Sequence, residues 1–144
     1  ALKSAYVQLR SFQQTDFQFM LQEHSSDEMA GPTRGSDWDD NGVWRSLHLH
    51  TWTPDNVRII GSWEQLYKGL AFAVDAQSYA DITPSQKAQA VFIQSLYTFY
   101  LTDLFGQVSM RLPGESPANP PSIQLNRTEA IDYAIEILEA ELAI

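Results

Sequence analysis

The four tryptophans of the chain, Trp38, Trp44, Trp52 and Trp63, lie close together in the sequence. Asp, Asn, Arg and His residues separate the first three, whereas a core-forming segment would repeat apolar residues at a regular period. Flat aromatic rings stack on sugars or other planar apolar faces, while nearby carboxylate, amide and guanidinium groups orient a ligand through hydrogen bonds. The composition favours a polar recognition surface. The alternative for any single tryptophan is a structural anchor, because Trp is usually mostly buried.

A partial calcium-binding pattern overlaps the first of these tryptophans. The run Asp37-x-Asp39-x-Asn41-Gly42 matches the first half of an EF-hand loop, which uses oxygen ligands at alternate positions. The position that needs a bidentate glutamate holds His48 instead, and no helix pattern precedes the run. An ordinary acidic turn is therefore favoured, and calcium binding is left open.

A second candidate metal site consists of two nearby histidines. His48 and His50 would lie on one side of an extended strand, and His24, Asp27 or Glu28 could supply a further ligand. Such a site would fit a metal-dependent hydrolase. The spacing alone is weak evidence for a metal site. The favoured interpretation is that both histidines form ordinary hydrogen bonds within a loop.

Other catalytic patterns do not emerge from the sequence. The many Asp and Glu residues offer no defined acid–base pair, and there is neither a Gly-rich phosphate loop nor a serine nucleophile elbow. We therefore predict that the protein is not an enzyme, with no catalytic residues, no metal and no cofactor.

Composition limits the classes of partner. The 144 residues include 9 basic and 18 acidic side chains, a net charge of −9, which argues against nucleic acid and against direct binding to an anionic membrane surface. The absence of cysteine excludes disulfides and thiolate chemistry in this chain. No apolar run approaches the roughly 20 residues of a membrane-spanning helix.

Hydrophobic periodicity predicts four helices and an all-α fold. The first covers 2–13, and the second starts at Thr53-Pro54, with Thr as cap and Pro in the first turn. The third runs from a capping box at Thr83 to Gly106, and the fourth starts near Asn126. A long Trp-rich loop, defined as residues 14–52 and roughly forty residues in length, joins the first two helices, and loops of that length are usually functional.

The predicted second and third helices should pack antiparallel, because only a short connector joins them. We expect their contact to bury three residues of one helix against three of the other. These are Trp63, Tyr67 and Leu70 on the second helix, and Phe92, Leu96 and Phe99 on the third.

Several segments together resemble the N-terminal region of the SusD/RagB family. They are Gln22-Glu-His-Ser-Ser-Asp-Glu28, His50-Thr-Trp-Thr-Pro-Asp-Asn56, Trp63-Glu-Gln-Leu-Tyr-Lys-Gly-Leu70 and the helix 87–106. The resemblance covers nearly the whole chain. It implies a tetratricopeptide-like scaffold of helix pairs with long loops, in an outer-membrane lipoprotein of Bacteroidetes that captures glycans at the cell surface. The partners implied are an oligosaccharide or polysaccharide and a SusC-like TonB-dependent transporter.

The ends of the chain fit a part of a longer protein. The sequence starts in helical phase and stops at Ile144 within a helical pattern that has no C-cap. We therefore expect residues 1–144 to be the N-terminal part of a SusD-like domain. The resemblance then implies that membrane attachment occurs only through an N-terminal lipid anchor that this chain lacks.

The resemblance also implies site residues. By this match Trp52 is the ring that stacks on a sugar, and Asp27 and Asn56 are its hydrogen-bonding partners. Arg34 is a further match in the same region.

Two more glycan-binding residues, Trp38 and Trp44, are predicted from the composition of the Trp-rich loop alone. The alternative function is a helical-repeat adaptor for a protein or peptide, with the tryptophans as structural anchors. Exposure of Trp52 in a concave site next to Asn56 would favour the first function, and burial of Trp52 under the second helix would favour the second.

Overall fold

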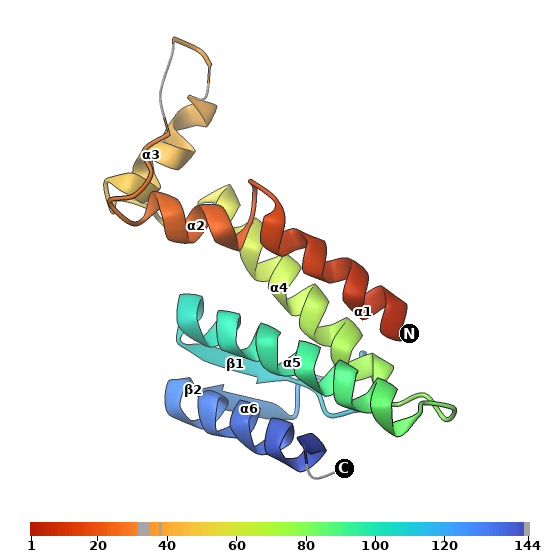
Figure 1. Cartoon of the computed structure of the whole chain (residues 1–144). Helices are drawn as coiled ribbons and strands as arrows, with labels where there is room; N and C mark the ends of the chain where they lie inside the picture. Colours follow the sequence, from red (N-terminus) through yellow and green to blue (C-terminus); the bar gives the residue numbers. More distant parts are fainter. Residues whose placement is uncertain (32–34, 38, 143–144) are drawn as a thin grey trace. The chain divides into compact units, whose positions relative to one another are not determined.

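The computed structural model describes residues 1–31, 35–37 and 39–142. They form two compact units, Arg10–Gln65 and Ala1–Leu9 with Leu66–Ile144. Along the chain the elements are α1 (Leu2–Gln8), the 3-10 helix η1 (Leu9–Gln13), α2 (Gln18–His24), the 3-10 helix η2 (Asp40–Gly42), α3 (Val43–His48), α4 (Val57–Ala76), α5 (Pro84–Phe105), β1 (Gln107–Met110), β2 (Ile123–Asn126) and α6 (Arg127–Leu142) (Figure 1). The described chain is thus mostly helical, as predicted, and it also contains a two-stranded sheet that was not predicted.

Helices α5 and α6 begin where their capping residues predict. Thr83 Oγ1 accepts the Gln86 N–H at 3.3 Å, and Gln86 Oε1 accepts the Thr83 N–H at 3.0 Å. Asn126 and Glu129 form the same reciprocal pair at 3.1 and 2.8 Å. Gly106 ends α5 in a left-handed conformation with φ of 78°, which a glycine adopts without steric cost.

Helices α5 and α6 lie side by side and run antiparallel (Figure 1). Lys87 Nζ donates to Glu141 Oε1 at 2.8 Å, and Arg127 Nη2 donates to the Asp103 carbonyl at 3.4 Å. Each bond joins the start of one helix to the end of the other. The pair is therefore fixed at both ends.

The two strands that connect α5 and α6 pair antiparallel, with Val108 opposite Leu125 and Met110 opposite Ile123. Val108 and Met110 are buried, whereas Gln107 and Ser109 are not, so one face of β1 joins the core. Each strand has only four residues. An alternation of that length is too short to separate a strand from a turn in the sequence.

The face of α5 that enters the core is not the predicted one. Leu70 of α4 is buried, as expected, but Phe92 and Phe99 of α5 are 56% and 49% exposed. The buried large side chains of α5 lie on another side of the helix and are Ile93, Tyr97 and Leu101. Helix α5 is apolar on more than one side, so its periodicity could not show which side packs.

Close approach of the backbone at Gly69 of α4 makes room for the buried ring of Tyr97. A Cβ atom at position 69 would overlap that ring. The absence of a side chain at Gly69 therefore sets how closely the two segments pack within this unit.

The unit Arg10–Gln65 contains the Trp-rich loop, and the loop is more structured than predicted. Helices α2 and α3 lie within it and contact each other. Their buried apolar residues are Met20, Leu21, Trp44 and Leu47. Both helices have seven residues or fewer, too short for a clear helical period in the sequence.

Candidate functional site

Trp52 is one of the exposed aromatic residues of the Arg10–Gln65 unit. The Trp52 side chain is 41% exposed, and its neighbours from Thr51 to Asp55 are exposed as well. This segment follows directly after the end of α3. Exposed hydroxyl and carboxylate groups therefore adjoin a partly exposed indole in the sequence, which is the combination that a sugar site uses.

A defined turn at the end of α3 positions Trp52. The Thr51 N–H donates to the Ser46 carbonyl at 2.9 Å, and the His50 N–H donates to the Leu47 carbonyl at 3.1 Å. These two bonds form a Schellman motif, in which the residue in the left-handed region is usually glycine. Here it is His50, with φ of 55°. A non-glycine residue in this conformation is unusual enough to indicate a local constraint.

The side chain of His50 supplies that constraint. Its Nε2 donates to the Ser25 carbonyl at 2.9 Å, and its ring lies 5.3 Å from the Trp52 ring at a tilt of 56°. The bond ties the segment that carries Trp52 to the segment that carries Asp27, which is exposed. The structure thus connects two of the predicted site residues through a residue that sequence reasoning had assigned to a possible metal site.

Trp44 lies in a different environment from Trp52. It is 2% exposed, and its Nε1 donates to Asp40 Oδ2 at 2.9 Å. One face stacks on His24 at 4.8 Å between ring centroids, and the Arg58 guanidinium carbon lies 4.6 Å from the ring centroid. Trp44 therefore offers no free face to a ligand, and the prediction that it binds glycan is corrected to a structural anchor.

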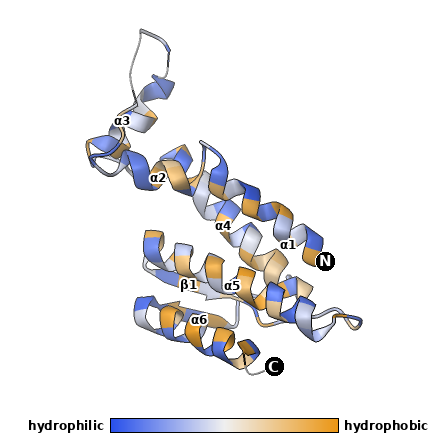
Figure 2. Ribbon diagram, viewed as in Figure 1, coloured by the Kyte–Doolittle hydropathy of each residue, from blue (hydrophilic) through white to orange (hydrophobic). Residues whose placement is uncertain are grey.

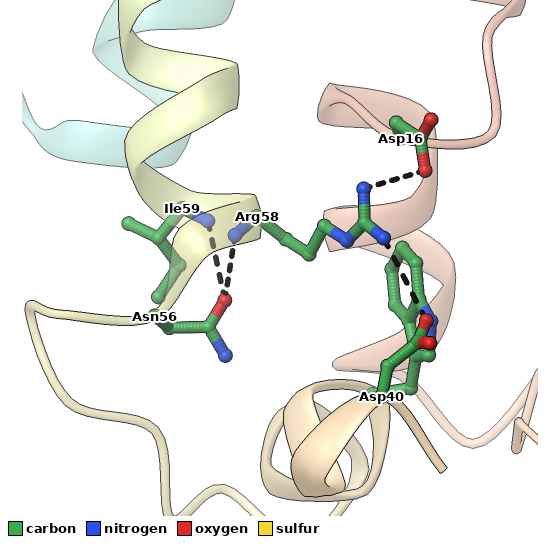
Figure 3. Close-up of polar contacts among 6 residues, drawn as sticks. Asp16, Asp40, Asn56, Arg58 and Ile59 are labelled. Carbon is green, nitrogen blue, oxygen red and sulfur yellow. Dashed lines mark hydrogen bonds and ion pairs between the residues drawn. The ribbon is translucent and has the colours of Figure 1, made fainter. Parts of the chain in front are cut away.

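Arg58 joins several parts of this unit (Figure 3). Its Nη1 pairs with Asp16 Oδ1 at 2.6 Å, and its Nη2 lies 3.6 Å from Asp40 Oδ2. The same Asp40 carboxylate accepts the Trp44 indole N–H. The guanidinium therefore links α4 to the segments before α2 and at η2, a role that sequence reasoning missed. The only sequence feature that could have indicated this role is the position of Arg58 near the start of the predicted helix, four residues after Pro54.

Asn56 is the cap of α4 rather than a free ligand group. Its Oδ1 accepts the N–H groups of Arg58 and Ile59 at 2.9 and 3.3 Å (Figure 3). Its Nδ2 donates to the Val43 carbonyl at 3.3 Å and to Ser46 Oγ at 3.1 Å. Four bonds use the full capacity of an amide. The predicted glycan contact through Asn56 is therefore corrected, and so is the predicted cap at Thr53.

Two predicted site residues, Arg34 and Trp38, lie outside the described residues. Trp63, the remaining tryptophan, lies on α4 and is 39% exposed. The prediction that Trp63 is buried in the helix contact is therefore wrong, and its exposure resembles that of Trp52.

Of the proposed calcium ligands, Asp39 forms an ion pair with Arg45 at 3.6 Å. The neighbouring Asp40, which is not one of the proposed ligands, contacts Trp44 and Arg58. Residues 1–31, 35–37 and 39–142 contain no group of three or more His, Asp or Glu side chains arranged to hold a metal ion. The two histidines of the hydrolase hypothesis are also separated in role, because His50 binds the Ser25 carbonyl whereas His48 lies near His24.

His24 is a buried component of the anchor around Trp44. Burial is the main reason that its pKa lies below the usual value, and the nearby His48 lowers the pKa further. Neither ring nitrogen of His24 has a hydrogen-bond partner among the described side chains and backbone groups. A Cβ atom on Gly31 would come within 3.0 Å of the His24 ring, so the backbone closes over it.

Comparisons of the chain with protein-family models, with curated proteins and with solved structures found no match. In the part of the chain that the structure describes, no helix is both long and apolar enough to cross a membrane.

Proposed function

We propose that the chain is the N-terminal part of a SusD/RagB-like protein that captures glycans without catalysis. In this proposal it holds an oligosaccharide or polysaccharide at the outer-membrane surface and delivers it to a SusC-like TonB-dependent transporter. Attachment to the membrane would use an N-terminal lipid outside this sequence. The observation that supports the proposal best is the exposure of Trp52 on a polar segment that His50 bonds to Ser25.

The chemistry of this segment suits a sugar. An indole ring stacks on the C–H face of a pyranose, and the exposed groups of Asp27 and of Thr51 to Asp55 can bond its hydroxyls. The hydrogen bond between His50 and Ser25 restrains the segment that carries the ring before a ligand arrives. Pre-ordering lowers the entropy lost on binding.

The scaffold is compatible with the same proposal. The described chain is mostly helical, and α5 and α6 pack antiparallel, although a two-stranded hairpin rather than a short turn joins them. The resemblance of the sequence to the family supplies the glycan as ligand class and the transporter as partner.

Titration calorimetry of the chain against a panel of oligosaccharides tests the proposal. We expect Trp52→Ala to weaken binding of the recognised glycan by about tenfold, since one stacking ring contributes about 0.5–1.5 kcal/mol beyond its area. Trp63→Ala is the matched control, because Trp63 is similarly exposed but lies on a helix outside the proposed site. It should leave the affinity unchanged.

Two outcomes would contradict glycan capture. One is the absence of binding heat with every glycan of the panel. The other is loss of folding in Trp52→Ala, which would make the ring an anchor. In either case the helical-repeat adaptor becomes the better interpretation.

A further inference from the structure

An apolar groove runs between α5 and α6, on the side of α5 that does not enter the core. Its volume is about 250 Å³, below the roughly 300–1,000 Å³ of pockets that enclose small ligands. Six large apolar side chains line it: Phe92, Leu96 and Phe99 of α5, and Ile131, Ile135 and Leu138 of α6. The size fits a few inserted side chains better than an enclosed small molecule.

The apolar residues of the groove are unusually accessible. Phe92, Phe99 and Ile135 are each about half exposed, and Figure 2 shows hydrophobic residues recurring along α5 and α6. Between its first and last lining residues the groove spans about two helical turns, or roughly 10 Å. Grouped apolar residues of this kind mark a surface for a partner more often than scattered ones do.

The flank of the groove on α6 is acidic. Asp132, Glu136 and Glu139 are exposed and follow a spacing that places them on one side of the helix, next to Ile135. None of these three carboxylates forms an ion pair with another described residue. Lys87 and Arg127 lie at the ends of the helix pair, and they are the only basic residues of α5 and α6. An apolar centre is thus combined with an acidic edge.

We propose that this groove binds an amphipathic α-helix of another protein, whose apolar stripe is flanked by lysine or arginine. A helix satisfies its own backbone hydrogen bonds, so it needs only side-chain contacts from a groove between two helices. Its apolar residues would insert between Phe92, Phe99 and Ile135. Its basic flank would lie along Asp132, Glu136 and Glu139, which gives the complex a defined orientation.

The charge of the groove disfavours two other occupants. A second copy of the chain carries the same net charge of −9 and the same acidic flank, so the two flanks would repel. An anionic membrane surface attracts basic segments and would repel this one.

Fluorescence anisotropy with the full chain and synthetic peptides tests the proposal. The probe is a labelled helical peptide of ~18 residues, about five turns, with leucines along one side and lysines on both flanks. A matched peptide carries glutamate at every lysine position. We expect the lysine peptide to bind at least about tenfold more tightly at low salt, with the difference falling as salt screens the charges.

Variants locate the binding in the groove. Ile135→Glu should remove binding of the lysine peptide, whereas Leu49→Glu, a similarly exposed apolar residue in the other unit, should not. Joint replacement of Asp132 and Glu136 by lysine should reverse the preference towards the glutamate peptide. Trp52→Ala should leave peptide binding unchanged, so this proposal and glycan capture can fail separately. Circular dichroism establishes that each variant is folded.

Three results would overturn the proposal. The first is equal affinity for the lysine and glutamate peptides, and the second is lysine-peptide binding that survives Ile135→Glu. The third is a dimer in sedimentation equilibrium that Ile135→Glu dissociates, which would assign the groove to a second copy of the chain.

Discussion

At the residue scale, Trp44 and Trp52 show how the same side chain serves two purposes within one segment. Trp44 is enclosed by the ring of His24, the guanidinium of Arg58 and the carboxylate of Asp40. The Trp52 ring contacts His50, and the residue is 41% exposed. Burial thus distinguishes Trp44, a structural anchor, from Trp52, a candidate sugar platform. Replacing each ring should therefore change the free energy of unfolding by a different amount.

Trp44→Ala should destabilise the protein by about 3–5 kcal/mol, because it removes a buried ring and leaves the indole partner Asp40 without its donor. Trp52→Ala should change the free energy of unfolding by less than about 1 kcal/mol, as at exposed positions generally. Urea denaturation of both variants measures the difference. Equal losses would show that the two rings have the same structural role.

His24 makes stability depend on pH in a defined direction. Its pKa is lowered in the folded state, mainly by burial, whereas the unfolded chain has a value near 6.5. The unfolded state therefore binds more protons as the pH falls below about 6.5, and stability decreases from there towards the lower folded pKa. The slope contributed by one group is at most about 1.4 kcal/mol per pH unit.

His24→Phe keeps a ring against Trp44 but removes the titrating group. We expect this variant to lose most of the decrease in stability between pH 6.5 and about 5 that the parent chain shows in urea titrations. A variant that keeps the full decrease would mean that other groups cause it.

At the element scale, the start of α4 determines how the Trp52 segment joins the scaffold. Thr53-Pro54 has the composition of a helix start, yet α4 begins at Val57 and Asn56 provides the cap. The Asn56 side chain also bonds the Val43 carbonyl and Ser46 Oγ, and so connects α4 to α3. These additional bonds to α3 favour Asn56 over Thr53 as the cap of α4.

Asn56→Ala should cost about 2 kcal/mol, the upper end for a cap, because it also removes the bonds from Asn56 to the Val43 carbonyl and Ser46 Oγ. Thr53→Ala, at the position that the sequence suggested, should cost less than about 0.5 kcal/mol. Thermal or urea unfolding compares the two variants. A larger loss for Thr53→Ala would contradict the observed helix start.

The elements that the sequence predicted well are those with local signals. Helices α5 and α6 are bounded by side chains within four residues of their starts, and α5 ends at a glycine. The short α2 and α3 and the hairpin depend on contacts with distant segments. Their sequence patterns were therefore too weak to detect.

The candidate site divides in the same way. Trp52 is partly exposed, as predicted, whereas the burial of Trp44 and the bonds of Asn56 to Val43 and Ser46 arise from contacts between residues separated in sequence. The tie from His50 to Ser25 joins residues 25 positions apart. No local spacing rule could have indicated it.

At the scale of the whole molecule, two surfaces of different chemistry lie in different compact units. The Trp52 surface belongs to Arg10–Gln65 and suits a polar ligand with a flat apolar face. The groove between α5 and α6 belongs to the other unit and suits an apolar helix with basic flanks. Substitutions at one surface should therefore leave binding at the other unchanged.

The most direct test of glycan capture follows the indole N–H groups by NMR while the glycan recognised in calorimetry is added. Each resonance is assigned by replacing one tryptophan at a time with phenylalanine. We expect the Trp52 resonance to move in proportion to occupancy. The Trp44 resonance, from a buried N–H bonded to Asp40, should stay in place. Movement of Trp44 or Trp63 without Trp52, or no movement with any glycan, would contradict Trp52 as the sugar platform.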